Sequence, residues 1–410
     1  MRAVALLFLV MNASAHADET PLSLALPTGN TALLRGDGAD FYQVIERNLH
    51  GVISHPWQGG QYGFVRDPIE TPSGTVYTRF HEGMDIRPLR RDARGEPLDE
   101  VGAIAEGTVV YTSQAAGASN YGRYVVVEHR WSGCPYYSLY AHLSTIAVEV
   151  GQHVKQKEKL AVMGHTGTGI NRERAHVHVE LNLLINDHFE QWHETYFKGE
   201  PNRHGIYNGL NLAGLDLPRL LVAARQNSSL TLPEFLSREE VFYKVIVPAS
   251  PDFQLPLRYP WMIAGLPNDE PSAWEISFAR SGVPLQLRAS NKAITAAELS
   301  YVKPGVIDSR NLTRGNVAGR GSSAHLTESG RTLMRLYTFP HQGSSGGSRR
   351  SLRFSKAALV LFTSSVEQEH SFEQSCNAQS GIHFYRSPGI DRFRCRFCDS
   401  VHGRAHPKRL

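Results

Sequence analysis

Two histidines spaced two residues apart, His176 and His178, are the residues whose types and spacing most clearly fit a chemical site. They lie in the valine-rich segment 175–181, which is typical of a short β-strand. Residues i and i+2 of a strand point to the same face, so the two imidazoles are expected side by side, with Glu180 along the same face. Neighbouring imidazoles on an apolar background need partners, and imidazole is a common zinc ligand. For either histidine alone, a satisfied core or surface position is the alternative.

A histidine and an aspartate four residues apart, His81 and Asp85, extend this set. Gly83 lies between them and allows the chain to turn, so both side chains can face one centre. With His178 they supply two nitrogens and one carboxylate oxygen, the three-ligand set with an open fourth position that catalytic zinc sites use. Zinc lowers the pKa of a bound water to about 7 and polarises carbonyl groups, so this set suits hydrolysis. The His-Glu-x-x-His helix motif of other zinc peptidases is absent from the sequence.

The ligand-type residues fall in three motifs, His81-x-x-x-Asp85, Tyr140-x-His142-Leu143 and His176-x-His178. In this order the motifs resemble the lysostaphin-type (LytM-like) zinc metallopeptidases, which cleave peptide bonds in bacterial peptidoglycan. The resemblance covers about residues 55–185. Further matching segments are Tyr62-Gly63-Phe64, Glu106-Gly107-Thr108-Val109-Val110, Val150-Gly151-Gln152-His153-Val154 and Met163-Gly164-His165-Thr166-Gly167. Each segment alone is a weak signal, whereas the combined set is specific.

The resemblance implies a role for each of these positions. His81, Asp85 and His178 would bind Zn, while His142 and His176 would hold the attacking water or the developing oxyanion. It also implies a mainly β fold, in which an antiparallel sheet built from a duplicated hybrid motif carries a groove. The implied function is that of an exported zinc metalloendopeptidase, which hydrolyses peptide bonds of peptidoglycan by means of a Zn-bound water.

Two other functions stay open at this point. A relative without catalysis would act as a peptidoglycan-binding or amidase-activating scaffold, and a general secreted protease would act on proteins. Every ligand and helper position is filled in this sequence, which favours activity. Glu180 is either a partner that orients a ligand imidazole or a surface glutamate. The charged segment 89–100 looks longer than the family's usual turn and is expected to form a loop near the cleft.

Short β-like runs bounded by turn residues must position these side chains. They occur at 108–111, 124–128, 160–163, 175–181, 241–247 and 274–278. Helices are expected at 40–49, 187–197 and 217–225. No long helical pattern separates the first strands, so a parallel doubly wound sheet is not expected. We predict a mainly antiparallel β fold with a peptidase core and a smaller all-β domain.

The predicted domains follow from these runs and from changes in composition. They are a signal peptide over 1–17, a leader over 18–50, a LytM-type metallopeptidase domain over 51–190, a helical connector over 191–236, a small all-β domain over 237–340 and a basic Ser/Arg-rich tail over 341–410. The signal peptide rests on Arg2, the apolar run Ala3 to Met11 and the small residues before cleavage after Ala17. We therefore expect an exported protein. No apolar run reaches the length of about 20 residues that a transmembrane helix needs.

The positive charge of the chain is concentrated in the tail. The whole sequence has 43 Lys+Arg and 39 Asp+Glu, of which 341–410 holds 11 and 5. The rest is slightly acidic, so nucleic acid is not an expected partner. The tail has the composition of a flexible or disordered segment and suits contact with anionic polymers of the cell envelope. It also contains Cys395, Cys398, His402 and His406, which are either a zinc set with unusual spacing or, for the two cysteines, a disulfide.

Overall fold

The computed structural model describes residues 20–265 and 270–340, which all belong to one compact unit, Met1–Phe362. A second unit, Thr363–Leu410, lies entirely outside the described residues. The signal peptide predicted over 1–17 and the tail predicted over 341–410, including its cysteines and histidines, also fall outside them. Among the described residues, no helix has the length and apolar character needed to span a bilayer.

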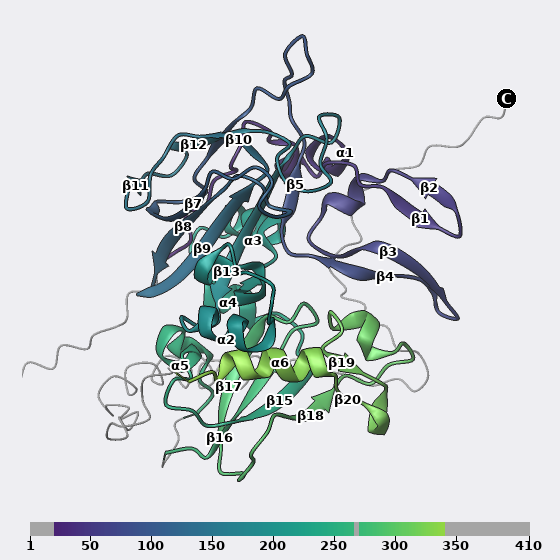
Figure 1. The fold of residues 1–410 in the computed structure, drawn as a ribbon, viewed down its shortest axis with the longest axis vertical. Coiled ribbons are helices and arrows are strands. Elements are labelled where there is room, and N and C mark those ends of the chain that lie inside the picture. The colour runs from purple at the N-terminus through teal and green to yellow at the C-terminus, as the bar shows by residue number, and fades with distance from the viewer. Residues whose placement is uncertain (1–19, 266–269, 341–410) are drawn as a thin grey trace, which may run out of the picture. The chain divides into compact units, whose positions relative to one another are not determined.

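A large antiparallel sheet forms the centre of the N-terminal part of the chain (Figure 1). Its strands run in the order β11 (His153–Val154), β7 (Gly107–Ser113), β8 (Tyr124–Trp131), β9 (Cys134–Ala141), β13 (Val177–Leu184) and β14 (Leu212–Gly214), and β5 (Met84–Ile86) also pairs with β13. The strands predicted at 108–111 and 124–128 are confirmed as parts of β7 and β8. Every residue of β13 is buried, because it has strand neighbours at both edges and a core beneath it.

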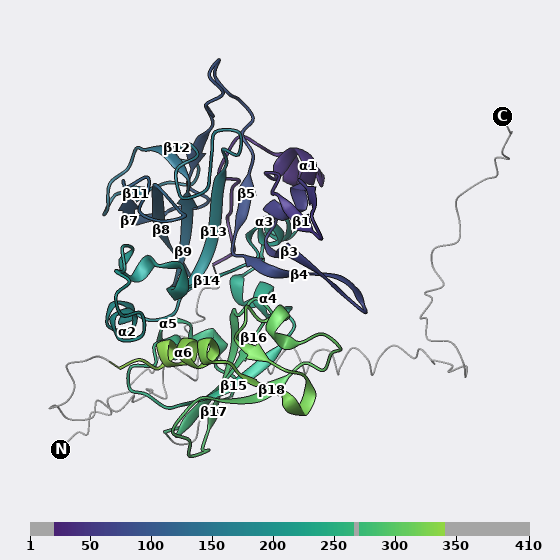
Figure 2. The ribbon, with the colours of Figure 1, turned by 45° about the vertical axis from the view of Figure 1, so that its right-hand side comes forward.

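Smaller sheets and hairpins flank the large sheet. β10 (Leu143–Ile146), β12 (Lys159–Met163) and β6 (Glu100–Gly102) form a three-stranded sheet, and β1 (Arg47–Leu49) pairs with β2 (Val52–Ser54). β3 (Gly63–Thr71) and β4 (Gly74–His81) form a longer hairpin, which extends away from the large sheet in Figure 2. The strand β4 ends at His81, so the hairpin brings that side chain to the edge of the large sheet beside β5.

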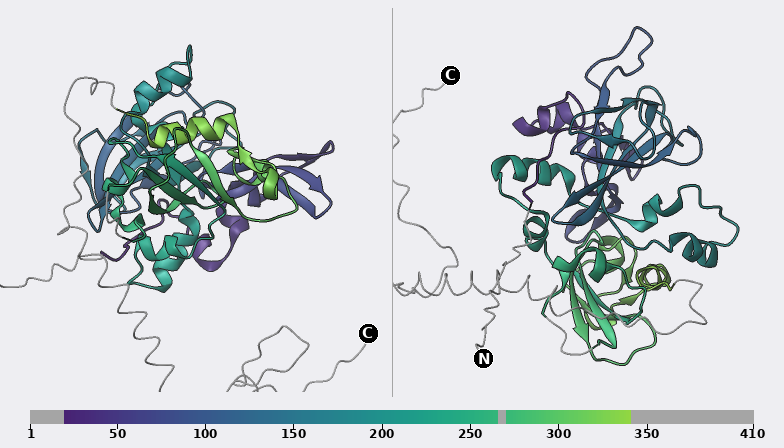
Figure 3. Two further views of the ribbon diagram at one scale, coloured as in Figure 1. Left: turned by 90° about the horizontal axis from the view of Figure 1, so that it is seen from below. Right: turned by 90° about the vertical axis from the view of Figure 1, so that its left-hand side faces the viewer.

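A second antiparallel sheet follows in the C-terminal part of the described chain (Figure 3). It consists of β17 (Pro284–Ser290), β16 (Ala273–Phe278), β15 (Tyr243–Pro248) and β18 (Glu298–Val302), in that order. The same region contains α5 (Leu255–Arg258), α6 (Glu328–Tyr337) and the short pair β19 (Val317–Ala318) and β20 (His325–Leu326). The region predicted to be all-β therefore also contains helices; Tyr337 of α6 packs edge-on against Phe278 of β16.

One apolar core runs through both sheet regions. The cluster of buried side chains includes Leu22 of the predicted leader, Val179 of the large sheet and Ile276 of the second sheet. Hydrogen bonds also cross between the regions: the Asn186 side chain donates to the carbonyl of Leu336 over 2.8 Å. The boundaries predicted at 51, 191 and 237 stay predictions, since packing is continuous across them.

Two of the three helices predicted from the sequence are present in the structure. Those at 187–197 and 217–225 are confirmed as α2 (Phe189–Tyr196) and α3 (Leu217–Gln226). The predicted connector also holds α4 (Leu232–Ser237) and, unexpectedly, the strand β14.

The prediction of a helix at 40–49 is wrong. Only α1 (Gly38–Phe41) forms, and residues 47–49 belong to β1. The chain after α1 instead follows the edge of β5, where the Gln43 amide donates to the carbonyl of Asp85 over 2.8 Å. Tertiary strand contacts outweigh local helix propensity in this segment.

Candidate metal centre

Three strands bring His81, Asp85 and His178 to one point. His81 ends β4, Asp85 is the middle residue of β5, and β5 pairs with β13 so that Asp85 lies directly opposite His178. The turn between β4 and β5 lies tightly against β13. A Cβ atom added to Gly83 would lie 2.3 Å from the Val179 carbonyl oxygen, so this close approach requires glycine.

The three side chains direct one donor atom each at a common centre. Nε2 of His81 lies 3.0 Å from Nδ1 of His178 and 3.1 Å from Oδ1 of Asp85, and that oxygen lies 2.9 Å from Nδ1 of His178. Three ligands with the bond lengths of tetrahedral zinc would lie about 3.3 Å apart. The triangle therefore has close to the size of one face of a zinc tetrahedron, and all three residues are buried.

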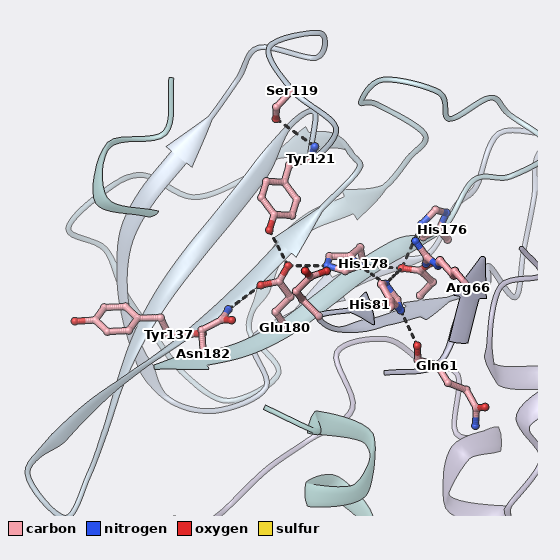
Figure 4. A network of polar contacts seen from close by, with 12 residues as sticks. Gln61, Arg66, His81, Ser119, Tyr121, Tyr137, His176, His178, Glu180 and Asn182 are labelled. Atoms are coloured by element: carbon pink, nitrogen blue, oxygen red, sulfur yellow. Dashed lines mark hydrogen bonds and ion pairs between the residues drawn. The ribbon is translucent and has the colours of Figure 1, made fainter. Parts of the chain in front are cut away.

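Hydrogen bonds on the outer side of each imidazole fix which nitrogen carries the proton. Nδ1 of His81 is 2.7 Å from the carbonyl oxygen of Gln61, and Nε2 of His178 is 2.8 Å from Oε1 of Glu180 (Figure 4). Both partners are acceptors, so each outer nitrogen donates. The inner nitrogens then present lone pairs to each other and to the Asp85 carboxylate. A cation must lie among these atoms, and a metal ion satisfies all three donors at once, so the residues fit a zinc ion.

The electrostatics of the group agree with a site for a cation. Burial opposes a charge on Asp85, but His81, His176 and Arg66 around it hold the pKa of that carboxyl well below its usual range. Burial also opposes protonation of His178, yet the carboxylates that flank it raise its pKa to about 10. In the absence of a metal, a proton on His178 therefore supplies the positive charge that the site demands.

Glu180 is a buried partner of His178, which excludes the surface position left open from the sequence. Its Oε1 also accepts a hydrogen bond of 2.9 Å from the Tyr121 hydroxyl, and its Oε2 accepts one of 2.9 Å from the Asn182 amide. Figure 4 shows this chain of contacts leading from Ser119 through Tyr121 to the histidine. Such a network holds the ring orientation and the tautomer of His178.

Arg66 completes the surroundings of Asp85. Its Nη2 lies 2.6 Å from Oδ2 of Asp85, while its Nε donates to the carbonyl of Gly59 over 3.0 Å. One carboxylate oxygen therefore faces the arginine and the other faces the histidines. Arg66 and Gln61 are absent from the sequence-based site. Arg66 lies on β3, the partner strand in the hairpin that carries His81, and thus outside the three motifs, while Gln61 contributes only a backbone oxygen.

The two predicted helper histidines lie beside this centre. Their ring centroids are 4.7 Å apart, and Nε2 of His176 is 3.5 Å from Oδ1 of Asp85. Nδ1 of His142 donates to the Thr166 carbonyl over 3.0 Å, and Nδ1 of His176 donates to the Arg174 carbonyl over 2.6 Å. Burial, followed by the nearby His176 and His178, holds the pKa of His142 well below its usual range. His142 is therefore neutral at pH 7, with Nε2 as a base.

A cleft of about 1000 Å³ opens onto the centre and is lined by His81, Asp85, His178 and His142. The segments 168–170 and 208–210 form further parts of its lining, together with residues of the β3–β4 hairpin. The segment 89–100, expected as a loop near the cleft, contributes no lining residue. Glu96 of that segment instead contacts His165 at 3.0 Å and Arg172 at 2.7 Å, so the loop packs against the segment that leads to His176.

An antiparallel sheet with a buried His-Asp-His group at one edge, open to a cleft, defines a domain of the metallopeptidase class. The family model described as Peptidase family M23 matches residues 79–190, which include all five predicted site residues. The chain belongs to this family, since it is 38% identical over 76 residues to "Lipoprotein NlpD" of Yersinia enterocolitica, a match that covers 18% of this chain and 70% of the relative.

Two further relatives have different descriptions. An "Uncharacterized metalloprotease" of Haemophilus influenzae is 36% identical over 170 residues, which are 38% of this chain and 32% of the relative. The "Murein hydrolase activator NlpD" of Escherichia coli is 37% identical over 81 residues, 20% of each chain. The chain thus spans a third or less of the length of the first relatives that it matches.

Solved structures of the same kind are also similar. A zinc-containing peptidase from Vibrio cholerae has 27% identity, with 35% of this chain and 36% of that chain covered and a TM-score of 0.21. The catalytic domain of lysostaphin from Staphylococcus simulans has 25% identity, with 29% and 76% covered and a TM-score of 0.21.

Proposed function

We propose that the protein is a zinc metalloendopeptidase of the bacterial cell envelope, which hydrolyses peptide bonds in peptidoglycan. His81, Asp85 and His178 would hold the zinc ion, and His142 and His176 would assist the reaction. The convergence of two imidazole lone pairs and a carboxylate oxygen on one buried point carries this proposal. A zinc ion bound there would polarise the substrate carbonyl and lower the pKa of a water molecule to about 7.

The chain's own residues account for the remaining parts of hydrolysis. His142 is neutral, and its Nε2 has no hydrogen-bond partner among the described residues, so it can take a proton from the attacking water and return it to the leaving amine. His176 lies against both His142 and Asp85, so its ring can donate to the oxygen on which negative charge develops, once Nε2 is protonated. Arg66 keeps the Asp85 carboxylate oriented with one oxygen toward the centre.

The cell-envelope setting rests on the sequence and on the names of relatives. The signal peptide predicted over 1–17 would export the chain. Relatives are described as lipoproteins, including the "Outer membrane antigenic lipoprotein B" of Histophilus somni, and as murein hydrolase activators. Peptidoglycan peptides are therefore the proposed substrate.

Metal content and peptidoglycan hydrolysis test this function together. The purified mature protein is expected to contain about one zinc per chain and to clear a peptidoglycan suspension. His81→Ala and Asp85→Ala are expected to lose zinc and clearing while circular dichroism shows an intact sheet. His153→Ala is the matched control, because that side chain is exposed, pairs with Glu106 and does not belong to the lining of the cleft. Clearing by His81→Ala at the wild-type rate would exclude the enzymatic proposal.

A second candidate function, an activator of other murein hydrolases, is favoured by the name of the NlpD relatives. An activator needs no zinc ligand, so an amidase would be stimulated equally by the wild type and by His81→Ala. Mass spectrometry of muropeptides released by the wild type alone and by His178→Ala separates the two functions. New peptide ends that appear only with the wild type support the peptidase function. If neither protein releases new peptide ends, the activator function is supported instead.

A further inference from the structure

One residue of the lining of the metal cleft, Arg314, comes from the C-terminal region of the chain. Arg314 lies between the 3-10 helix η6 (Ser309–Leu312) and β19, yet it lines the same cleft as His81 and Asp85. The family match ends at residue 190, so Arg314 lies outside the matched segment. The cleft therefore contains a group that the family resemblance does not assign.

The backbone holds Arg314 in an unusual conformation. Its φ is +56°, in the left-handed region that residues with a Cβ atom seldom adopt. The fully buried Thr313 fixes the preceding turn, because its hydroxyl donates to the Ser309 carbonyl over 2.7 Å. The Gly315 amide donates to the Arg310 carbonyl over 3.1 Å and closes the turn. Conformations of this kind persist where the surroundings determine them and often mark functional positions.

The guanidinium of Arg314 is held in place, but most of its hydrogen-bonding capacity is unused. Its Nη2 pairs with Glu82, the residue that directly follows His81, and the group lies 5.0 Å from the centroid of the Phe80 ring. An arginine has five N–H donors. Among the described residues, the bond to Glu82 is the one hydrogen bond that this side chain makes. The group is therefore oriented by two contacts and still has donors for a further acceptor.

The other arginines of the cleft are less suited to a ligand. Arg66 is engaged with Asp85 and with the Gly59 carbonyl, and Arg174 donates through Nη1 to Gly169. Arg79 is exposed, and no ion pair within the described residues orients it. Arg174 also has an unpaired donor, Nε, but that atom is buried. Arg314 is held by Glu82 and Phe80 rather than by a proposed zinc ligand, and it keeps unused donors among the described residues.

We propose that Arg314 binds a carboxylate of the peptide substrate on the side of the cleft next to the turn between His81 and Asp85. The inference rests on the proposed peptidase function and makes it more specific: the substrate is a peptide with a free carboxylate near the scissile bond. A guanidinium can form two parallel hydrogen bonds with a carboxylate, which gives both affinity and direction. The C-terminal region is then part of the substrate site.

Binding of defined muropeptides tests this assignment. The probe is a cross-linked muropeptide dimer with free carboxylates, compared with two derivatives in which either the diaminopimelate side-chain carboxylate or the terminal α-carboxylate is amidated. Affinity is measured by calorimetry with the zinc-loaded His142→Ala protein, which keeps the proposed ligands but lacks the helper base, so that no turnover interferes. One of the two amidated derivatives is expected to bind about tenfold more weakly, as for the loss of a charged hydrogen bond.

Variants of Arg314 in the same background decide the outcome. Arg314→Gln is expected to bind the free and the amidated dimers equally, and Arg314→Lys to keep part of the preference. Arg314→Gly relieves the positive φ, so it should lose the preference without a lower melting temperature. Arg280→Gln is the control, since Arg280 packs on Phe64 away from the cleft lining.

Two results would overturn the assignment: equal binding of free and amidated dimers by the parent protein, or an unchanged preference in Arg314→Gln. Failure of the proposed function gives a different pattern. In that case the protein with His142 intact leaves the dimer uncleaved, while the preference for a free carboxylate still depends on Arg314.

Discussion

Glu180 is the side chain on which the orientation of His178 depends. Its Oε1 accepts from both His178 and Tyr121, and its Oε2 accepts from Asn182. Glu180→Gln can keep the contacts of Oε1 with His178 and Tyr121. Its new NH₂ group faces the Asn182 amide, which must flip to accept from it and then loses its own 3.4 Å bond to the Tyr137 carbonyl. This substitution therefore removes the charge and keeps the contact that orients His178, at some cost on the side of Asn182.

We expect Glu180→Gln to weaken zinc binding by about tenfold and Glu180→Ala by about a hundredfold, the range seen for partners of metal-binding histidines. Competition with a zinc chelator measures both values. The control is Glu128→Gln on strand β8 of the same sheet, which β9 separates from β13; its carboxylate pairs with Arg130 and should not affect zinc. Wild-type affinity in Glu180→Ala would show that the orientation of His178 does not depend on this carboxylate.

His129 is a buried histidine of the large sheet and lies apart from the metal centre. Its Nδ1 is 2.7 Å from the Glu106 carbonyl oxygen and its Nε2 is 2.7 Å from the Ser138 hydroxyl. Burial lowers its pKa to about 4, against a small opposing effect of the Glu106 carbonyl. The folded state thus resists a proton that the unfolded chain accepts below about pH 6.5.

The free energy of unfolding is therefore expected to fall as the pH drops from 6.5 toward 4, with His129 contributing about 2 kcal/mol of the loss by pH 5. Urea titrations at pH 7 and pH 5 measure this loss. His129→Gln has no titrating group at this position, so its loss over the same interval should be smaller by that amount. Equal losses in both proteins would show that His129 is not protonated on unfolding in this range.

At the scale of elements, the turn between β4 and β5 links the hairpin to the large sheet. Gly83 in this turn faces the backbone of β13, where an added Cβ would lie 2.3 Å from the Val179 carbonyl oxygen and 2.9 Å from Cγ of Glu180. A β-strand paired on both edges cannot move to make room. Gly83→Ala must therefore displace the turn, and with it Asp85.

Gly83→Ala is expected to lower stability by about 1–3 kcal/mol, as for overpacking in a core, and to weaken zinc binding. Thermal unfolding and chelator competition measure the two effects. Gly117→Ala is the control, since a Cβ there meets no atom within 4 Å and its φ is not in the left-handed region. If Gly83→Ala binds zinc as tightly as the wild type, the position of Asp85 does not depend on this close packing.

The strands and the three ligand-type side chains were predictable, because alternation, turn residues and motif order are local signals. The residues that orient those side chains were not predictable from the sequence. Gln61 acts through its backbone oxygen, so residue type carries no signal for it. Arg66 reaches Asp85 from the partner strand of the hairpin that carries His81, and Arg314 reaches the cleft from the C-terminal region. The prediction of a helix at 40–49 is wrong for the same reason: this segment pairs with β5, and such a long-range contact leaves no local signal in the sequence.

At the scale of the whole molecule, the continuous core predicts that the described region unfolds as one unit. Buried side chains from the leader, the large sheet and the second sheet belong to a single apolar cluster. The ion pair of Arg314 with Glu82 also joins the C-terminal region to the turn between two proposed zinc ligands. Stabilisation of the metal centre should then reach the second sheet.

Calorimetry of the metal-free and the zinc-loaded protein tests this coupling. Zinc at a thousand times its dissociation constant stabilises the folded state by about 4 kcal/mol, which corresponds to a rise in melting temperature of roughly 5–10 °C for a chain of this size. We expect one transition in both samples, shifted as a whole by zinc, and no shift in His178→Ala. Two transitions, of which zinc moves only one, would instead place an independent domain near the boundary predicted at 237 and confine the effect of the metal to the large sheet.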